Sequence, residues 1–155
     1  MGTPMYIPGA LSSLRDSFAL HLNATKAPKT AVIYLAALDS LIRHLESAGL
    51  PTAAPGIKRE HIESWMAARR HQVKPASLSL QFRALVQFFR WAVQEAEIEH
   101  SPMEKIGPPR VPDAPIPVIE VSVLRRLFRA CEGKGFNERR DAAVLLFLYD
   151  SGVRL

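Results

Sequence analysis

Apolar residues recur at every third or fourth position along most of this chain, the spacing that places side chains on one face of an α-helix. The pattern predicts four helices in the first hundred residues, over 11–22, 30–48, 58–71 and 75–96. The second shows the spacing most regularly, with Tyr34, Leu38, Leu41, Leu45 and Ala48 in its apolar stripe. No stretch of any length alternates apolar and polar residues as a half-buried strand does. We therefore predict an all-α fold in which four helices with short connections close a small bundle.

Prolines gather between residues 101 and 117, at Pro102, Pro108, Pro109, Pro112, Pro115 and Pro117. Proline lacks a backbone N–H and interrupts both helices and sheet ladders, so we expect this segment to be an extended, fairly stiff tether. The position of this tether predicts a domain over residues 1–100, a linker over 101–117 and a second portion of the chain over 118–155.

The second portion carries two further predicted helices. Residues 121–131 are amphipathic, and a final helix is expected to begin at Asn137 or just after it. That helix contains the apolar run from Ala142 to Tyr149, in which Tyr149 is expected to be a core residue, and it ends at Gly152. A helix that ends at a glycine normally leads into another packed element. We therefore expect one complete module and the incomplete opening of a second.

Positive charge is concentrated in the first module. The 155 residues include 20 Lys and Arg against 15 Asp and Glu, a net charge of +5. Residues 1–110 hold 13 basic and 9 acidic residues, whereas residues 111–155 hold 7 and 6. A basic helical module favours a polyanion such as DNA or RNA as its partner. Charge alone favours the alternative, a soluble protein that is merely basic.

Several classes of protein and site are not indicated. Cys131 is the only cysteine, so no internal disulfide or cysteine-ligated zinc site is expected, and a reduced cytoplasmic location follows. No apolar run reaches the roughly 18 residues of a membrane helix, and the N-terminus lacks the layout of a signal peptide. The five histidines show no metal-ligand spacing, and no phosphate-binding glycine loop or catalytic triad is present. We expect neither a metal nor a small-molecule cofactor.

The fourth predicted helix has a second stripe opposite its apolar one, formed by Ser79, Arg83, Gln87, Arg90 and Gln94. Lys74 and Ser77 precede this stripe, and the first acidic residue after them is Glu95. A long helix face of hydrogen-bond donors suits the phosphates and base edges of double-stranded DNA. The alternative is a solvated face that happens to lack glutamate.

Basic residues also gather at two helix ends. The start of the second helix carries Lys26, Lys29 and Thr30, and an anion is favoured at this position. Thr30 is equally well explained as the residue that caps the helix. Arg69 and Arg70 lie at the end of the third helix, where complementing the helix dipole explains them as well as DNA does.

The aromatic residues Trp65, Phe88 and Trp91 are candidate stacking platforms for bases, but their helical spacing favours a place in the core.

Three stretches together resemble the tyrosine recombinases, or phage-type integrases. Residues 29–41, with Thr30, Tyr34 and a leucine stripe, are similar to the first DNA-contacting helix of that family. Residues 77–91, with their Phe-Phe-Arg-Trp run, and residues 98–103, with Ser-Pro, are similar to the last helix of its core-binding domain and to the turn that follows. Residues 139–155 resemble the opening of the catalytic domain, in which a Ser-Gly-Val-Arg turn presents the first catalytic arginine, here Arg154.

The resemblance implies a SAM-like core-binding domain of four to five helices, followed by two helices of an incomplete catalytic domain. Its implied partners are double-stranded DNA and other recombinase protomers. In the intact enzymes of this family a tyrosine attacks the scissile phosphate, two arginines and a histidine stabilise the transition state, and a lysine protonates the leaving oxygen. No metal or high-energy cofactor takes part.

The chain departs from the family in what it lacks. No histidine is followed three residues later by arginine, and the lysine hairpin and the late tyrosine are missing. We therefore expect the DNA-binding portion of a recombinase, a fragment that binds DNA and does not cleave it.

Two other functions stay open. A helical protein-interaction module would bind a partner helix through Val144, Leu145, Phe147 and Leu148. A helical DNA-binding regulator would have no recombinase activity.

Overall fold

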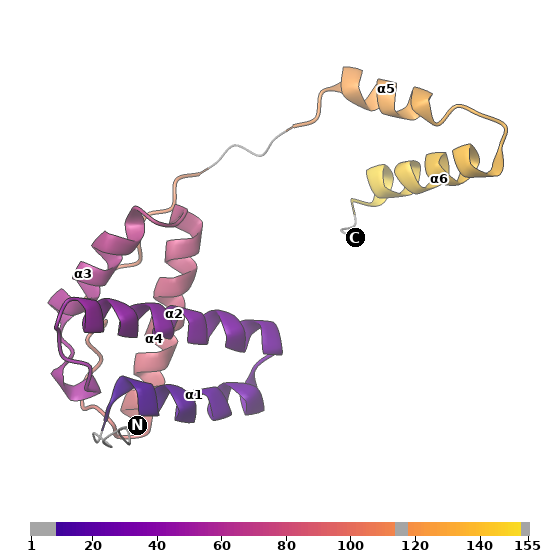
Figure 1. Cartoon of the computed structure of the whole chain (residues 1–155). Helices are drawn as coiled ribbons and strands as arrows, with labels where there is room; N and C mark the ends of the chain where they lie inside the picture. Colours follow the sequence, from indigo (N-terminus) through magenta and orange to yellow (C-terminus); the bar gives the residue numbers. More distant parts are fainter. Residues whose placement is uncertain (1–8, 114–117, 153–155) are drawn as a thin grey trace. The chain divides into compact units, whose positions relative to one another are not determined.

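The computed structural model describes residues 9–113 and 118–152, and these residues are helical without a β-strand, which confirms the all-α prediction. The chain divides into two units, Met1–Pro112 and Asp113–Leu155. The first unit contains α1 (Leu11–Thr25), α2 (Pro28–Ser47), a short 3-10 turn η1 (Ala54–Gly56), α3 (Arg59–Arg70) and α4 (Pro75–Gln94). The second contains α5 (Val121–Ala130) and α6 (Phe136–Ser151) (Figure 1).

The first unit is organised around α2, which contacts α1, α3 and α4 (Figure 1). Its predicted apolar stripe supplies Leu38, Leu41 and Leu45, all of them fully buried. A cluster of aromatic rings joins α1 to α4, with the ring centroids of Phe18 and Phe88 5.3 Å apart and edge to face. These contacts bury the apolar faces that the sequence pattern predicted, and hydrophobic burial is the main stabilising term for such a bundle.

Two polar contacts fix the helices of the bundle relative to one another. The indole N–H of Trp65 on α3 donates to the Ser40 hydroxyl on α2 at 3.2 Å, and both groups are buried. On the outer side, Arg15 of α1 forms a two-pronged ion pair with Asp39 of α2, with Nη2 3.1 Å from Oδ2. The hydrogen bond to Asp39 raises the pKa of the Arg15 guanidinium.

The start of α2 differs from the prediction. The helix begins at Pro28, with Ala27 as its N-cap, and the Thr30 N–H donates to the Ala27 carbonyl. Thr30 therefore lies inside the first turn, and its predicted role as a cap is wrong. Proline suits the first helical position because its missing N–H would have no partner inside the helix there.

Two helices of the bundle end in the same hydrogen-bond arrangement, a Schellman motif. After α2 the amide of Leu50 donates to the Leu45 carbonyl, and Gly49 takes the left-handed conformation. After α4 the amide of Glu97 donates to the Ala92 carbonyl, but the left-handed residue is Ala96, with φ at 58°. Ala96 was predicted to be the last residue of this helix, and the structure instead exposes it beyond the helix end.

The proline-rich segment also differs from the prediction in its first part. Residues 102–105 form turns, Met103 is buried, and Ile106 packs against the core of the bundle. The Ser101 hydroxyl accepts a hydrogen bond from the Met103 N–H at 3.2 Å, which fixes the first of these turns. The apolar side chains of Met103 and Ile106 explain the difference, because burying them against the bundle is favourable in free energy and draws this part of the segment onto the core.

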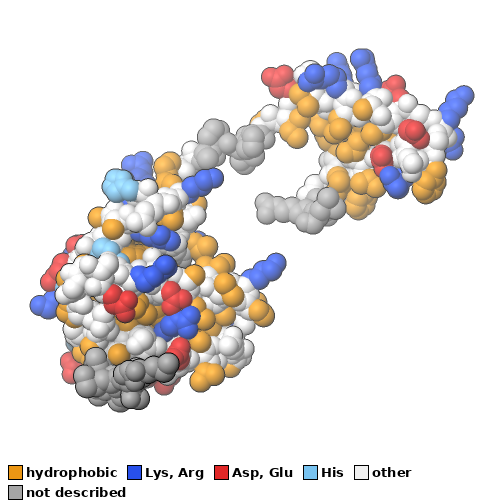
Figure 2. Space-filling view, viewed as in Figure 1, with side chains coloured by type: hydrophobic (Ala, Val, Ile, Leu, Met, Phe, Trp, Pro, Cys, Tyr) orange, Lys and Arg blue, Asp and Glu red, His pale blue; other side chains and the backbone are white. Residues whose placement is uncertain are grey.

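The second unit is a pair of helices without a core of its own, since no residue of α5 or α6 is buried. The rings of Phe128 and Tyr149 meet edge to face at 6.1 Å. Tyr149 was expected to be a core residue, but it is 66% exposed. The prediction that α6 ends at Gly152 is confirmed, because this residue adopts the left-handed conformation as its C-cap. Figure 2 shows the apolar side chains that this unit presents on its surface.

Candidate nucleic-acid interface

The outward face of α4 carries the donor stripe that the sequence predicted. Arg83, Arg90 and Gln94 are exposed, and Ser79 and Gln87 are half-buried. The opposite face of the helix is buried in the core through Leu78, Phe82, Leu85, Phe89 and Ala92. Because successive residues of a helix rise by about 1.5 Å, the stripe from Ser79 to Gln94 extends over roughly 22 Å. This length allows contacts with several consecutive phosphates or base edges.

No carboxylate of the described residues forms an ion pair with the arginines of this face. Within residues 9–113 and 118–152 the ion pairs join Arg15 to Asp16 and Asp39, Arg59 to Glu63, and Arg140 to Asp141. None of them includes Arg83 or Arg90. A guanidinium that is not neutralised within the fold keeps its full charge and its donors for an external anion.

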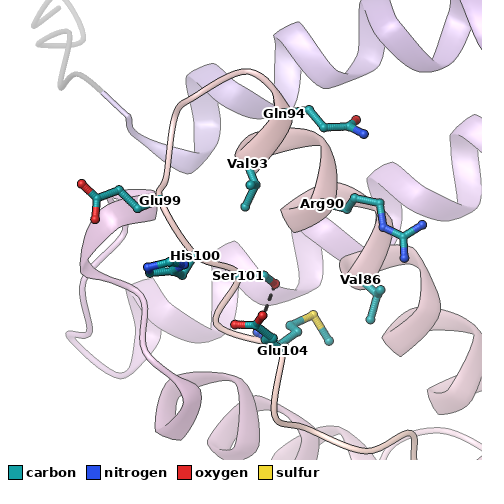
Figure 3. A pocket seen from close by; sticks show the side chains of 9 residues that line it. Val86, Arg90, Val93, Gln94, Glu99, His100, Ser101 and Glu104 are labelled. Carbon is teal, nitrogen blue, oxygen red and sulfur yellow. Dashed lines mark hydrogen bonds between the residues drawn. The ribbon is translucent and has the colours of Figure 1, made fainter.

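Arg90 also borders a groove of about 490 Å³ beside α4. The other wall of the groove is the chain that follows α4, which includes Glu99, His100 and Glu104. Figure 3 shows the Arg90 side chain directed away from Glu99 and Glu104. The acidic side chains of this wall therefore do not pair with Arg90, and its guanidinium can bind an external anion on the outward side of the helix.

The start of α4 adds a further cation and a hydroxyl. Lys74 is the N-cap residue and Ser77 lies in the first turn, and both side chains are exposed. The Lys74 side chain makes no capping hydrogen bond, and the helix begins at Pro75 with no acidic residue in its first turn. This end of α4 is therefore electropositive through both its side chains and its free backbone amides.

The second predicted group lies at the start of α2, the helix that contacts α4. Lys26 and Lys29 are exposed, whereas Thr30 and Tyr34 are half-buried and Tyr34 packs against the core. No hydrogen bond joins this group to the α4 stripe within residues 9–113. Both groups belong to one packed unit, which fixes them relative to each other.

The three candidate aromatic platforms are core residues. Trp65, Phe88 and Trp91 are all buried, with exposures of 1%, 0% and 6%. Base stacking needs an open ring face, so the core prediction for these residues is confirmed.

In the described part of the chain, no helix combines the length and the apolar composition that a membrane span requires. No group of three or more His, Cys, Asp or Glu side chains within residues 9–113 and 118–152 is arranged to hold a metal ion. Arg154, the predicted catalytic arginine, lies outside the described residues.

Comparison with known proteins gives a consistent set of relatives. Residues 16–96, about half of the chain, match the family described as the phage integrase N-terminal SAM-like domain. Tyrosine recombinase XerC of Pseudomonas syringae pathovar tomato is 25% identical over 144 residues, which covers 90% of this chain and 48% of the relative. Tyrosine recombinase XerD of Listeria innocua is 24% identical over 148 residues, covering 94% of this chain and 50% of the relative.

A shorter match is closer in sequence. Tyrosine recombinase XerC of Salmonella typhi is 33% identical over 91 residues, covering 57% of this chain and 29% of the relative. The chain spans about half the length of the curated relatives that it matches along most of its own length. No solved structure matches it significantly.

Proposed function

The chain belongs to the tyrosine recombinase family of phage-type integrases, and from this premise we propose that its helical bundle binds double-stranded DNA through the outward face of α4 and the start of α2. The membership confirms the predicted SAM-like, all-helical fold of the first unit. The observation that carries the proposal is a helix face with exposed guanidinium and amide donors, on which neither arginine has a carboxylate partner in the part of the chain that the structure describes.

The chemistry of this face fits a duplex in two ways. Arg83 and Arg90 supply the charge and the forked donors that bind phosphate oxygens, and Ser79, Gln87 and Gln94 supply neutral donors for phosphates or base edges. Lys26, Lys29 and Lys74 add charge at two helix starts, where free backbone amides also favour an anion. Thr30, Tyr34 and Ser77 contribute hydroxyl groups beside these cations.

Most of the affinity is electrostatic under this proposal, so it depends steeply on salt. If about four to six phosphates are contacted, the logarithm of the binding constant falls with the logarithm of salt concentration at a slope of about −4 to −5. A slope near zero contradicts DNA binding by this face.

The proposal includes a limit on chemistry. These 155 residues contain Arg154 as the family's first catalytic arginine but no His-x-x-Arg sequence, lysine hairpin or late tyrosine. A single phosphate-binding arginine without a nucleophile or a general acid cannot break a phosphodiester bond. The chain is thus proposed to bind DNA without cleaving it, as the DNA-binding portion of a site-specific recombinase that acts with other protomers.

The direct test replaces the two exposed arginines of α4. The double variant Arg83→Gln/Arg90→Gln is expected to lose about tenfold in duplex affinity per arginine, because a charge-assisted hydrogen bond contributes about 1.5–3 kcal/mol. The matched control is Lys58→Gln/Arg59→Gln at the start of α3, which removes the same net charge elsewhere in the bundle. Fluorescence anisotropy with a labelled duplex measures the affinity, and circular dichroism verifies the fold. Equal losses in the two variants would mean that only net charge matters, and would overturn the assignment of the α4 face.

A second function is supported by one observation in the second unit. Val144 is 49% exposed and Phe147 64% exposed, so this surface, with Leu145 and Leu148, offers an apolar face to a partner helix. A protein-interaction module of this kind predicts a Val144→Ser/Phe147→Ser variant that loses its partner, while Arg83→Gln/Arg90→Gln retains it. Retained duplex binding in Val144→Ser/Phe147→Ser, together with its loss in the arginine variant, favours the DNA-binding function.

A further inference from the structure

A polar pocket of about 230 Å³ opens between α2 and α3, on residues that the proposed DNA-binding face does not use. Its polar lining consists of Ser40, Arg43, His44 and Ser47 from α2, Arg69 from the last turn of α3, and Gln72 from the turn that follows α3. No acidic residue lines it. Two arginines, an imidazole and hydroxyl groups without a carboxylate are the donors that proteins use to bind oxyanions.

Arg69 is held in place without being neutralised. Its Nε donates to the Gln81 side-chain oxygen at 3.1 Å, and its Nη1 donates to the Gln72 side-chain oxygen at 2.7 Å. Both acceptors are uncharged amide oxygens, so the guanidinium keeps its positive charge. The side chain is half-buried, and its orientation is therefore fixed before any ligand binds.

Arg43 is arranged in a comparable way on the opposite wall. Its Nε donates to the backbone carbonyl of Asp39 at 3.2 Å. The Asp39 carboxylate itself is paired with Arg15 of α1. Arg43 forms no ion pair within residues 9–113 and 118–152, so its two terminal nitrogens remain as donors.

Neutral donors complete the pocket. The His44 ring nitrogen Nε2 and the Ser64 hydroxyl share a hydrogen bond of 3.1 Å, which ties the imidazole to α3. Ser40 accepts from the Trp65 indole, so the floor of the pocket is the buried contact between α2 and α3. The site is thus built on two packed helices.

We propose that this pocket binds a phosphate group, with Arg43 and Arg69 as the charged ligands. The phosphate has one of two sources, a backbone phosphate of DNA or free inorganic phosphate. The DNA source rests on the proposed function and would extend the contact surface from α4 to α2 and α3, whereas the free-phosphate source is independent of it.

The first experiment measures phosphate binding to the full chain without DNA. Inorganic phosphate is titrated at constant ionic strength against chloride while the NMR signals of the Trp65 indole N–H and the Arg69 Nε–H are followed. The signals are expected to shift with a saturable millimolar dependence. The variant Arg43→Gln, which alters an exposed side chain, is expected to weaken this dependence at least tenfold, and Arg69→Lys to weaken it while retaining charge. The control Arg59→Gln, an ion-paired arginine on α3, should leave it unchanged.

The second experiment identifies the source. If a backbone phosphate occupies the pocket, Arg43→Gln lowers the magnitude of the salt slope of duplex binding by about one, and Arg59→Gln does not. Saturable phosphate binding with an unchanged slope assigns the pocket to free phosphate. A lowered slope without free-phosphate binding assigns it to DNA. Phosphate shifts that are the same in Arg43→Gln as in the original chain, combined with an unchanged slope, overturn the proposal. Because the titration needs no DNA, failure of the proposed function at α4 does not affect its outcome.

Discussion

At the scale of single residues, the bundle depends on a few polar groups whose partners are fixed. Trp65 and Ser40 lie 25 positions apart in sequence and form a buried hydrogen bond between α3 and α2. Their pairing could not be predicted from the sequence, since it depends on how two helices pack. The meeting of Arg43 and Arg69 in one pocket could not be predicted either. No sequence pattern marked Arg43, and the helix dipole explained Arg69 as well as DNA binding did. By contrast, the outward direction of Arg83 and Arg90 followed from helical spacing alone.

Removing the Ser40 hydroxyl tests the buried hydrogen bond. Ser40→Ala is expected to lower the free energy of unfolding by about 1–3 kcal/mol, because the Trp65 indole N–H is left buried without an acceptor. Urea denaturation followed by circular dichroism measures the change. The control Ser17→Ala changes an exposed serine of α1 and reports the small effect of helix propensity alone. Equal stabilities of the two variants would show that the hydrogen bond contributes nothing.

At the scale of elements, the existence of each helix followed from the sequence better than its ends did. The spacing of apolar residues identified α1 to α5, because each of these helices buries or presents one apolar face, whereas α6 was identified by its continuous apolar run and the glycine at its end. The start of α2 was misplaced because Thr30 has the side chain of a cap, whereas Pro28 at the first helical position decided the boundary. The end of α4 was misplaced because Ala96 gives no sequence signal for a left-handed residue. The segment after Ser101 was misread because prolines dominate its composition while Met103 decides its packing.

The uncapped start of α2 predicts a stabilising substitution. Ala27 has the extended backbone of an N-cap residue but no side chain that accepts a hydrogen bond. Ala27→Ser is expected to raise the free energy of unfolding by about 1 kcal/mol, since its hydroxyl can accept from a free amide of the first turn. Ala36→Ser, at an exposed position inside α2, is the control and should be slightly destabilising. A denaturation midpoint that falls in Ala27→Ser would contradict this account of the helix start.

The end of α4 predicts a second stabilising substitution. Ala96 occupies the position that Gly49 holds after α2, and a side chain in the left-handed conformation is unfavourable by about 1–2 kcal/mol. Ala96→Gly is therefore expected to raise the free energy of unfolding by about 0.5–1 kcal/mol after the added freedom of the unfolded chain is subtracted. Ala36→Gly should instead lower it by about 1 kcal/mol, because it lies inside a helix. Thermal unfolding compares the two, and a destabilising Ala96→Gly would rule out the strain.

At the scale of the whole molecule, the two units differ in what holds them together. The first has a continuous core that runs from Leu11 to Met103, and it carries the donor face of α4, the basic start of α2 and the α2–α3 pocket. The second has exposed apolar residues on both helices and no buried residue in either. Two short helices bury too little apolar area to offset the conformational entropy that folding costs. The binding functions proposed for the first unit therefore do not require the second to be stably folded.

This difference predicts how fast backbone amides exchange in the isolated chain. Amides in the middle of α2 and α4 are expected to exchange through global unfolding, with protection of about 10³-fold or more for a bundle stable by a few kcal/mol. Amides of α5 and α6 are expected to show protection below about tenfold, because their helices open locally without disturbing a core. Hydrogen–deuterium exchange at two protein concentrations measures both. Protection in residues 121–151 that rises with concentration would show that the apolar faces of a second copy supply the missing burial. Protection there equal to that of α2 in dilute solution would contradict the prediction, because it would mean that these helices share the stability of the bundle.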